Sequence, residues 1–241
     1  LSPHPVTYWM YGSSGSFLPG DDYRVIGDPN EWVITIDDGL PPNSDAFSLY
    51  YGFHDGYDIF SNANPIPTSG TIYDYTLQRV VHTIDWTLRN LPLDTTRTYL
   101  TGKSMGAIGS IFTAMKIPEK IAAIFVYVPL IDVARPPSTN FDLPGIVNRL
   151  FGTYQTNLFT NDGYRRNERL NANYLMRVNR LKSLPIMFTF CGRNDIVVGW
   201  TEKIPFYDTL KTYRRGGFHF WGTGDHAQTF SSWQCQPTFP T

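Results

Sequence analysis

The chain has 241 residues, of which 41% are hydrophobic and 17% charged, so it can bury a large core and is not intrinsically disordered. Its formal net charge of −1 gives no electrostatic argument for binding nucleic acid or an anionic membrane. No apolar run approaches the ~20 residues that a membrane-spanning helix needs. We therefore expect one globular domain over residues 1–241, no nucleic acid partner and a small-molecule substrate.

The ends and the composition of the chain suggest where it works. The chain begins at Leu1 with neither a methionine nor a signal peptide, which predicts a processed or trimmed chain, or part of a longer protein. Aromatic residues make up 15% of the chain and arginine outnumbers lysine. Such a composition favours a secreted or periplasmic enzyme that acts on sugars or aromatic esters.

The first 90 residues predict short strands followed by one long helix. The strands are expected at 6–11, 23–26, 31–36 and 46–51, and an amphipathic helix is expected at about 72–90. Residues 1–30 are rich in Pro, Gly, Ser and Asp and contain the first two strands between turns. Apart from Glu31 and Thr35, the run 31–36 is apolar, as expected for a parallel strand covered on both faces.

The second half of the chain alternates between strands and helices. The strands are expected at 97–101, 121–128, 186–190 and 218–221, and the helices at 107–116 and 204–213. This alternation predicts an α/β fold with a mostly parallel central sheet and helices on both faces. The gap 132–183 is too long for a simple crossover, and we interpret it as a cap inserted over the carboxyl edge, with a helix at 165–181.

A serine flanked by glycines lies between a predicted strand and a predicted helix. Gly102-Lys103-Ser104-Met105-Gly106 matches the nucleophile-elbow pattern, in which small neighbours let strand and helix pass closely. The helix N-terminus would then favour negative charge beside Ser104. Gly-Lys-Ser also ends a phosphate-binding loop, but that motif needs a glycine at position 97, which is Arg97.

Two later loops supply the partners that a serine nucleophile needs. A histidine must take the hydroxyl proton, and a carboxylate must orient that histidine. Asp195 follows the strand at 186–190, and His226 lies in a glycine-rich loop after the last strand. The chain order Ser104, Asp195, His226 is the order found in α/β-hydrolases.

These motifs together resemble the α/β-hydrolase superfamily, in its esterase and prolyl-oligopeptidase-like branch. The resemblance covers about residues 31–230 and rests on the Ser104 elbow, the Gly192–Asp195 loop and Gly224-Asp225-His226. It implies Ser104 as nucleophile, His226 as general base and acid, and Asp195 as orienting carboxylate. It implies no cofactor and no metal.

The oxyanion hole of such enzymes needs two backbone amides aimed at the developing charge. The amide of Met105, directly after the nucleophile, is the first. The resemblance places the second after the strand at 31–36, at Gly39 or Leu40. Many relatives carry His-Gly in that loop, whereas this chain carries Asp37-Asp38-Gly39. A carboxylate facing the oxyanion would oppose catalysis, so either both aspartates point away or the hole is built differently.

Several alternatives stay open at the level of sequence. Asp132 is a second candidate for the acid, and His54 is a second candidate histidine, as a substrate contact. Cys191 and Cys235 are either a disulfide that ties the acid loop to the base loop or two unrelated thiols.

We expect a serine esterase that forms an acyl-enzyme on Ser104, with esters of carbohydrate or aromatic acids as substrates. The aromatic residues Trp200, Trp221 and Trp233 motivate that substrate class. A prolyl-oligopeptidase-like peptidase is the first alternative. A non-catalytic hydrolase-like binding domain is the second, motivated by the aspartates in the expected oxyanion loop.

Overall fold

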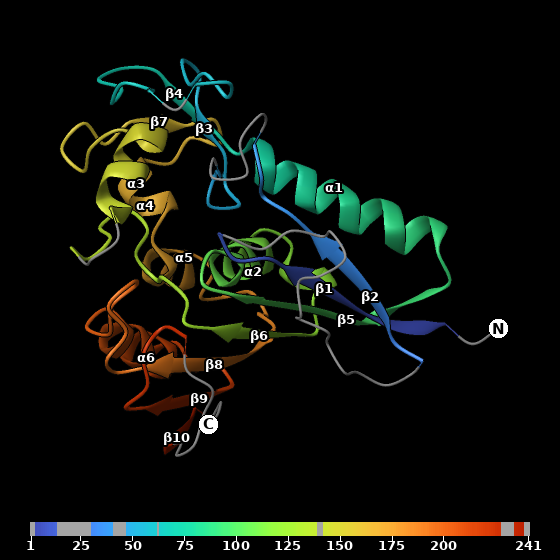
Figure 1. Ribbon diagram of the computed structural model, residues 1–241. Coiled ribbons are helices and arrows are strands. Elements are labelled where there is room, and N and C mark those ends of the chain that lie inside the picture. Colours follow the sequence, from blue (N-terminus) through green and yellow to red (C-terminus); the bar gives the residue numbers. More distant parts are fainter. Residues whose placement is uncertain are drawn as a thin grey trace.

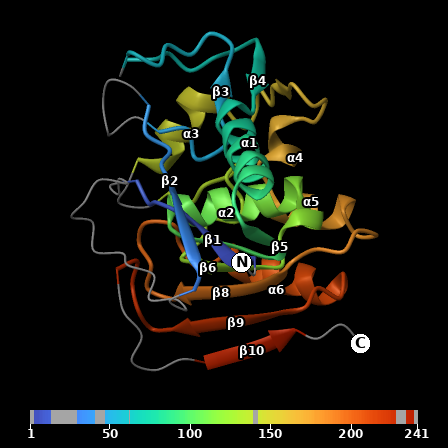
Figure 2. The ribbon, with the colours of Figure 1, turned by 90° about the vertical axis from the view of Figure 1, so that its right-hand side faces the viewer.

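A seven-stranded sheet runs through the computed structural model of the protein (Figure 1). The structure describes residues 3–13, 30–40, 47–61, 63–138 and 142–227, and the backbone of 234–238. The strand order in the sheet is β10-β9-β8-β6-β5-β1-β2. Six strands are parallel, and β10 runs antiparallel to β9, as the opposed arrows in Figure 2 show.

The strands of this sheet include every buried strand that the sequence predicted after residue 90. They are β1 (His4–Met10), β2 (Trp32–Ile36), β5 (Leu93–Lys103), β6 (Ala123–Tyr127), β8 (Ile186–Gly192), β9 (Gly217–Gly222) and β10 (Gln234–Thr238). The predicted strand at 23–26 lies outside the described residues. The α/β class and the mostly parallel sheet are confirmed.

Four helices form a layer in which each packs on the next. They are α1 (Tyr75–Asn90), α2 (Met105–Lys116), α5 (Ala172–Val178) and α6 (Lys203–Thr212). Helix α2 is central, because it contacts β1, β5 and β6 as well as α1 and α5. All residues of α2 except Lys116 are buried, which explains its nearly all-apolar sequence.

A smaller sheet with order β3-β4-β7 lies at the end of the molecule away from β9 and β10 (Figures 1 and 2). Strands β3 (Phe53–His54) and β4 (Thr71–Tyr73) precede α1, whereas β7 (Phe159–Thr160) belongs to the long insertion between β6 and β8. The insertion also holds α3 (Leu143–Phe151), which the sequence did not predict, and α4 (Arg166–Arg169). The 132–183 segment therefore shares a sheet with residues that lie before the nucleophile.

Three local expectations need correction. The predicted strand at 46–51 is a turn, because Leu49 and Tyr50 have φ of 55° and 54° and cannot continue a strand. Strand β2 lies at the sheet edge of the described chain, with Trp32 and Val33 exposed, so it is not covered on both faces. The helix expected at 165–181 is broken into α4 and α5, because Asn171 between them pairs with Asp132 and caps α5.

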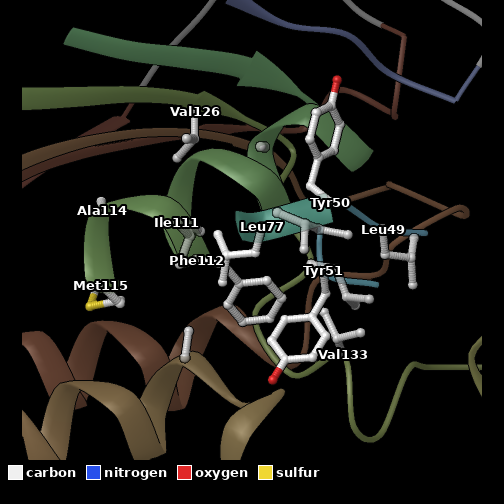
Figure 3. Close-up of a cluster of buried hydrophobic side chains, with 14 of the residues drawn as sticks. Leu49, Tyr50, Tyr51, Leu77, Ile111, Phe112, Ala114, Met115, Val126 and Val133 are labelled. Atoms are coloured by element: carbon white, nitrogen blue, oxygen red, sulfur yellow. The ribbon is translucent and has the colours of Figure 1, made fainter. Parts of the chain in front are cut away.

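The turn at residues 48–52 delivers two tyrosines into different parts of the core. Figure 3 shows the side chains of Tyr50 and Tyr51 pointing in opposite directions. Tyr51 packs edge-on against Phe112 of α2 and Phe151 of α3, with ring centroids 5.8 and 5.9 Å away. Both tyrosines are fully buried. A loop that looks like a strand in sequence thus joins α2 to the 132–183 segment, in addition to the contact of α2 with α5.

Candidate active site

The turn between β5 and α2 holds Ser104 in a backbone conformation that non-glycine residues rarely adopt. Ser104 has φ of 55° and ψ of −116°, and its amide donates to the Tyr127 carbonyl oxygen at 2.9 Å. A Cβ on Gly102 would lie 2.4 Å from the backbone of Gly106, and one on Gly106 would lie 2.0 Å from the Met10 carbonyl oxygen. Both glycines are therefore required, and local strain of this kind is concentrated at functional sites.

Three side chains predicted from the sequence meet at the carboxyl ends of their strands. Ser104 follows β5, Asp195 follows β8 and His226 follows β9. The His226 Nε2 lies 2.9 Å from the Ser104 Oγ, and its Nδ1 lies 2.8 Å from the Asp195 Oδ2. With the proton on Nδ1, the ring donates to Asp195, and Nε2 is free to accept the hydroxyl proton of Ser104.

The Asp195 carboxylate is held in its charged form. Burial alone would raise the pKa of Asp195, but hydrogen bonds from His226 and from the Val197 and Val198 amides outweigh burial and lower it. The Asp195 Oδ1 accepts those two amides at 2.8 and 3.0 Å, which leaves Oδ2 for His226. A charged, oriented carboxylate next to the imidazole is the arrangement that stabilises an imidazolium during proton transfer.

Backbone hydrogen bonds join the acid loop directly to the base loop. The Arg193 amide donates to the Gly222 carbonyl at 2.9 Å, and the Asn194 amide donates to the Gly224 carbonyl at 3.0 Å. A Cβ on Gly192 would lie 2.3 Å from the Gly224 carbonyl oxygen, so the two loops touch through their main chains. This contact fixes the distance between Asp195 and His226 without a covalent link.

The disulfide considered from the sequence is not formed. Cys191 is a free, buried thiol that accepts a hydrogen bond from the Tyr207 hydroxyl at 3.4 Å. Burial raises the pKa of the Cys191 thiol to about 11, so it stays protonated. The side chain of Cys235 lies outside the described residues.

The alternative acid and the other histidines lie in different environments. Asp132 is not bonded to His226, and burial followed by the nearby Glu202 charge raises its pKa to about 6. His219 is fully buried on β9 and bonds the Thr189 hydroxyl at 2.9 Å. His54 is buried, and its Nδ1 accepts the Gly56 amide at 3.0 Å. His82 is exposed on α1.

The predicted second oxyanion donors, Gly39 and Leu40, require a correction. They follow β2, and β1 lies between β2 and the nucleophile strand β5. Ile36 and Gly102 both pair with Met10, so β2 ends two strand spacings, ~9.5 Å, from the elbow. The Gly39 amide is also already bonded to the Asp37 Oδ1 at 2.7 Å. The structure therefore does not bring Gly39 and Leu40 to the elbow.

The loop after β1 lies beside Ser104 instead. A Cβ on Gly12 would lie 3.5 Å from the Lys103 carbonyl oxygen and 4.0 Å from the Ser104 Cβ. Within the described chain, the amides of Gly12 and Ser13 make no hydrogen bond. The Met105 amide heads α2, where the first N–H groups have no partner inside the helix. Among the residues that the structure describes, the elbow is therefore flanked by amides from two segments that have no hydrogen-bond partner.

Both aspartates of the Asp37-Asp38-Gly39 loop bond backbone amides outside the elbow. Asp38 is fully buried, and its carboxylate accepts hydrogen bonds from the Ser48 amide at 3.0 Å and the Tyr50 amide at 2.9 Å. Burial raises the pKa of Asp38 to about 6. Asp37 binds the Gly39 amide. Asp38, which the sequence suggested would oppose catalysis, thus bonds and stabilises the turn that carries Tyr50.

Residues outside the catalytic motif were harder to find. Tyr50 donates its hydroxyl to the Tyr11 and Ile36 carbonyl oxygens, at 3.1 and 2.8 Å, at the ends of β1 and β2. Its sequence neighbourhood predicted an ordinary strand. The pair Gly12-Ser13 directly after a predicted strand indicates a loop at the carboxyl end of that strand. The sequence did not reveal that this strand lies next to β5.

Neither a metal site nor a membrane span is evident in the described part of the chain. No group of three or more His, Cys, Asp and Glu side chains is arranged to hold a metal ion among the residues that the structure describes. No described helix is long and apolar enough to cross a membrane.

Comparisons with known proteins agree with this geometry. No protein-family profile matches the chain. It is 23% identical over 133 residues to an S-formylglutathione hydrolase of Mus musculus, a match that covers 52% of the chain and 46% of that relative. The chain therefore aligns with about half the length of this curated relative.

Solved structures share the fold over nearly the whole chain. An S-formylglutathione hydrolase from Agrobacterium tumefaciens matches 94% of this chain and 78% of its own, with a TM-score of 0.64 and 15% identity. FphF, a fluorophosphonate-binding serine hydrolase of Staphylococcus aureus, matches the same shares with a TM-score of 0.60 and 18% identity. An acylaminoacyl peptidase of Pyrococcus horikoshii matches 94% of this chain but 34% of its own, with a TM-score of 0.66 and 13% identity. The chain has the fold of the α/β-hydrolase serine hydrolases.

Proposed function

We propose that the protein hydrolyses carboxylic esters, thioesters included, through an acyl-enzyme on Ser104. The observation that carries the proposal is the hydrogen-bonded sequence from the Ser104 hydroxyl through the His226 ring to the Asp195 carboxylate. The similarity to proteins named S-formylglutathione hydrolases supports an acyl-transfer reaction and motivates the inclusion of thioesters.

The reaction takes two steps on this geometry. Ser104 Oγ attacks the carbonyl carbon while its proton passes to the His226 Nε2, and His226 then gives that proton to the departing alkoxide or thiolate. Water next attacks the acyl-enzyme, loses a proton to His226 and releases the carboxylic acid. Ser104 recovers its proton from His226. Asp195 keeps its charge throughout and stabilises the imidazolium.

We assign the oxyanion hole to the Met105 amide and to the Gly12 or Ser13 amide. Both segments flank Ser104, and within the described residues these amides donate no hydrogen bond. Fixed backbone dipoles of this kind are effective because they need no reorganisation as the charge develops. This assignment replaces Gly39 and Leu40.

A substrate panel with a matched pair of variants tests the proposal. Wild-type protein should hydrolyse short-chain aryl esters and simple acyl thioesters, and Ser104→Ala should abolish that turnover. Ser110→Ala is the control, because Ser110 is a buried serine of α2, the helix that follows Ser104, and its hydroxyl bonds the Gly106 carbonyl. Equal turnover by wild type and Ser104→Ala would refute the proposal, and loss of turnover in Ser110→Ala as well would point to damage of the fold.

The peptidase alternative rests on one specific observation, the shared fold with acylaminoacyl peptidase. That match covers only a third of the peptidase chain. Prolyl and acylated peptides therefore belong in the same panel. Ser104-dependent cleavage of peptides without cleavage of esters would replace the esterase proposal with this one. Absence of any Ser104-dependent turnover would favour a binding domain.

The finer substrate class and the location remain proposals. Trp200 and Trp221 motivated carbohydrate or aromatic-acid esters, but their rings pack against each other and against Tyr207 of α6 at the core. Trp233 lies outside the described residues. Feruloyl and acetylated-sugar esters in the panel would test the class. Fractionation of the source cells would test a secreted or periplasmic location.

A further inference from the structure

Tyr50 connects the oxyanion loop to the buried carboxylate of Asp38. The Tyr50 hydroxyl shares its one proton between two carbonyl oxygens, that of Tyr11, the first residue after β1, and that of Ile36, the last residue of β2. Burial, followed by the nearby Asp38 charge, raises the pKa of Tyr50, so the hydroxyl keeps its proton and remains a donor. The side chain is fully buried, so no water competes for these two acceptors.

The position of Tyr50 itself is fixed from two sides. Its backbone has φ of 54°, and the Asp38 carboxylate holds that conformation by accepting the Ser48 and Tyr50 amides. Its ring packs on α2, where a Cβ on Gly109 would lie 2.5 Å from the Tyr50 Cγ. Figure 3 shows the ring directed away from Tyr51 and beside the α2 ribbon. Neither the backbone nor the ring can shift without breaking these contacts.

The contact with Tyr11 matters because a peptide unit is planar. In a trans peptide, the carbonyl of one residue and the N–H of the next point in opposite directions. The Tyr11 carbonyl points toward Tyr50 and Gly106, so the following Gly12 N–H points the other way. A hydrogen bond that fixes the Tyr11 carbonyl therefore fixes the plane of the Gly12 N–H and the point from which the chain continues to Ser13.

We propose that Tyr50 is a positioning residue for the oxyanion hole, acting through the Tyr11–Gly12 peptide. This inference rests on the proposed function, since it concerns the hole assigned to the loop after β1. Tyr50 touches neither the substrate nor Ser104. Its hydroxyl lowers the reaction barrier by holding the loop amides where charge develops.

The test compares two single-atom deletions of buried tyrosines. Tyr50→Phe removes the hydroxyl and keeps the ring against Gly109. Tyr8→Phe is the matched control, because Tyr8 is equally buried on β1 and its hydroxyl bonds Thr87 of α1. We expect Tyr50→Phe to lower kcat roughly 10- to 100-fold, less than the loss of a whole donor, with KM changed less than about twofold. Tyr8→Phe should keep kcat within about twofold.

A covalent probe and a transition-state analogue separate positioning from stability. Tyr50→Phe should slow the labelling of Ser104 by a fluorophosphonate, and weaken an aryl boronate inhibitor, by factors similar to the fall in kcat. Thermal unfolding should show similar losses of stability for the two tyrosine variants. Suppose that wild-type Ser104 is labelled, and that the labelling rate, kcat and boronate affinity of Tyr50→Phe equal those of wild type. That result would overturn this inference and leave the proposed function intact. No labelling of wild-type Ser104 would overturn the proposed function and this inference with it.

Discussion

The two sides of the candidate site are held in place in different ways. On the acid–base side, the loops after β8 and β9 bond each other through main-chain atoms of Arg193, Asn194, Gly222 and Gly224. On the side of the proposed oxyanion hole, the Tyr11 carbonyl after β1 is bonded by the buried Tyr50, whose own amide is bonded by the buried Asp38 from another part of the chain. Substitutions should therefore affect chemistry on the first side directly and on the second side through positioning.

The largest effect is expected from removal of the base. His226→Gln should lower kcat by at least ~10⁴-fold, because Ser104 then has no acceptor for its proton. His82→Gln, at an exposed position of α1, should leave kcat within about twofold. Initial rates with an aryl ester measure both. A His226→Gln enzyme with nearly normal kcat would show that another group activates Ser104.

The choice between Asp195 and Asp132 as the acid gives the next largest effect. Asp195→Asn should lower kcat ~10³- to 10⁴-fold, because the amide favours the wrong tautomer of His226. Asp132→Asn should leave kcat within about threefold, since the His226 Nδ1 bonds Asp195 and not Asp132. A large loss of kcat in Asp132→Asn with little loss in Asp195→Asn would instead assign the acid of the triad to Asp132, after β6.

A proline scan locates the second oxyanion donor, with a smaller effect. Proline lacks an N–H, so Gly12→Pro or Ser13→Pro should lower kcat ~10²- to 10³-fold at whichever amide binds the oxyanion. Leu40→Pro removes the donor suggested by the family resemblance, and we expect kcat within about threefold of wild type. Circular dichroism of each variant checks folding. A large loss of kcat confined to Leu40→Pro would restore the assignment to the loop after β2.

The smallest expected effect is on the free energy of unfolding as a function of pH. The contribution of His219, on the acid–base side, falls as pH falls, whereas that of Asp38, on the other side, falls as pH rises. Burial lowers the pKa of His219 on β9 to about 4, so the stability it contributes is present above its unfolded pKa of ~6.5 and is lost as pH falls. Between pH 7 and 5 this loss is about 2 kcal/mol. Burial raises the pKa of Asp38 to about 6, so its contribution is lost as pH rises from ~4 to 6.

Denaturant unfolding at several pH values measures both contributions. The free energy of unfolding of His219→Gln should fall less than that of wild type between pH 7 and 5. Over the same acid range, Asp38→Asn should lose the gain in stability that wild type obtains as Asp38 takes up its proton. Unfolding curves with the same pH dependence in wild type and both variants would contradict the assigned protonation states.

The same contrast explains how much could be predicted from the sequence. The elbow, the Asp195 loop and the His226 loop each follow a strand that local periodicity reveals, and parallel strands place their carboxyl ends at one edge. Which strand pairs with β5 cannot be predicted from the local sequence. It depends on strand order, and β1 lies far from β5 in sequence. The oxyanion loop was therefore placed after β2.

The turn at Leu49 and Tyr50 was hidden for a related reason. The segment 47–51 has the side chains of a strand. The buried Asp38 carboxylate, which accepts the Ser48 and Tyr50 amides, instead helps to hold its backbone in a left-handed turn. Tertiary contacts overrode local propensity there. The small sheet β3-β4-β7 was missed because each of its strands has only two or three residues.

Trapping of the acyl-enzyme tests the central claim most directly. The protein would be mixed with an aryl ester, quenched in acid within the first turnovers, and analysed by intact-mass and peptide-mapping mass spectrometry. We expect one acyl group per chain, located on Ser104 and absent from Ser104→Ala. An acyl group on Lys103 or Cys191 instead, or turnover with no acyl group on Ser104 at any quench time, would contradict the mechanism.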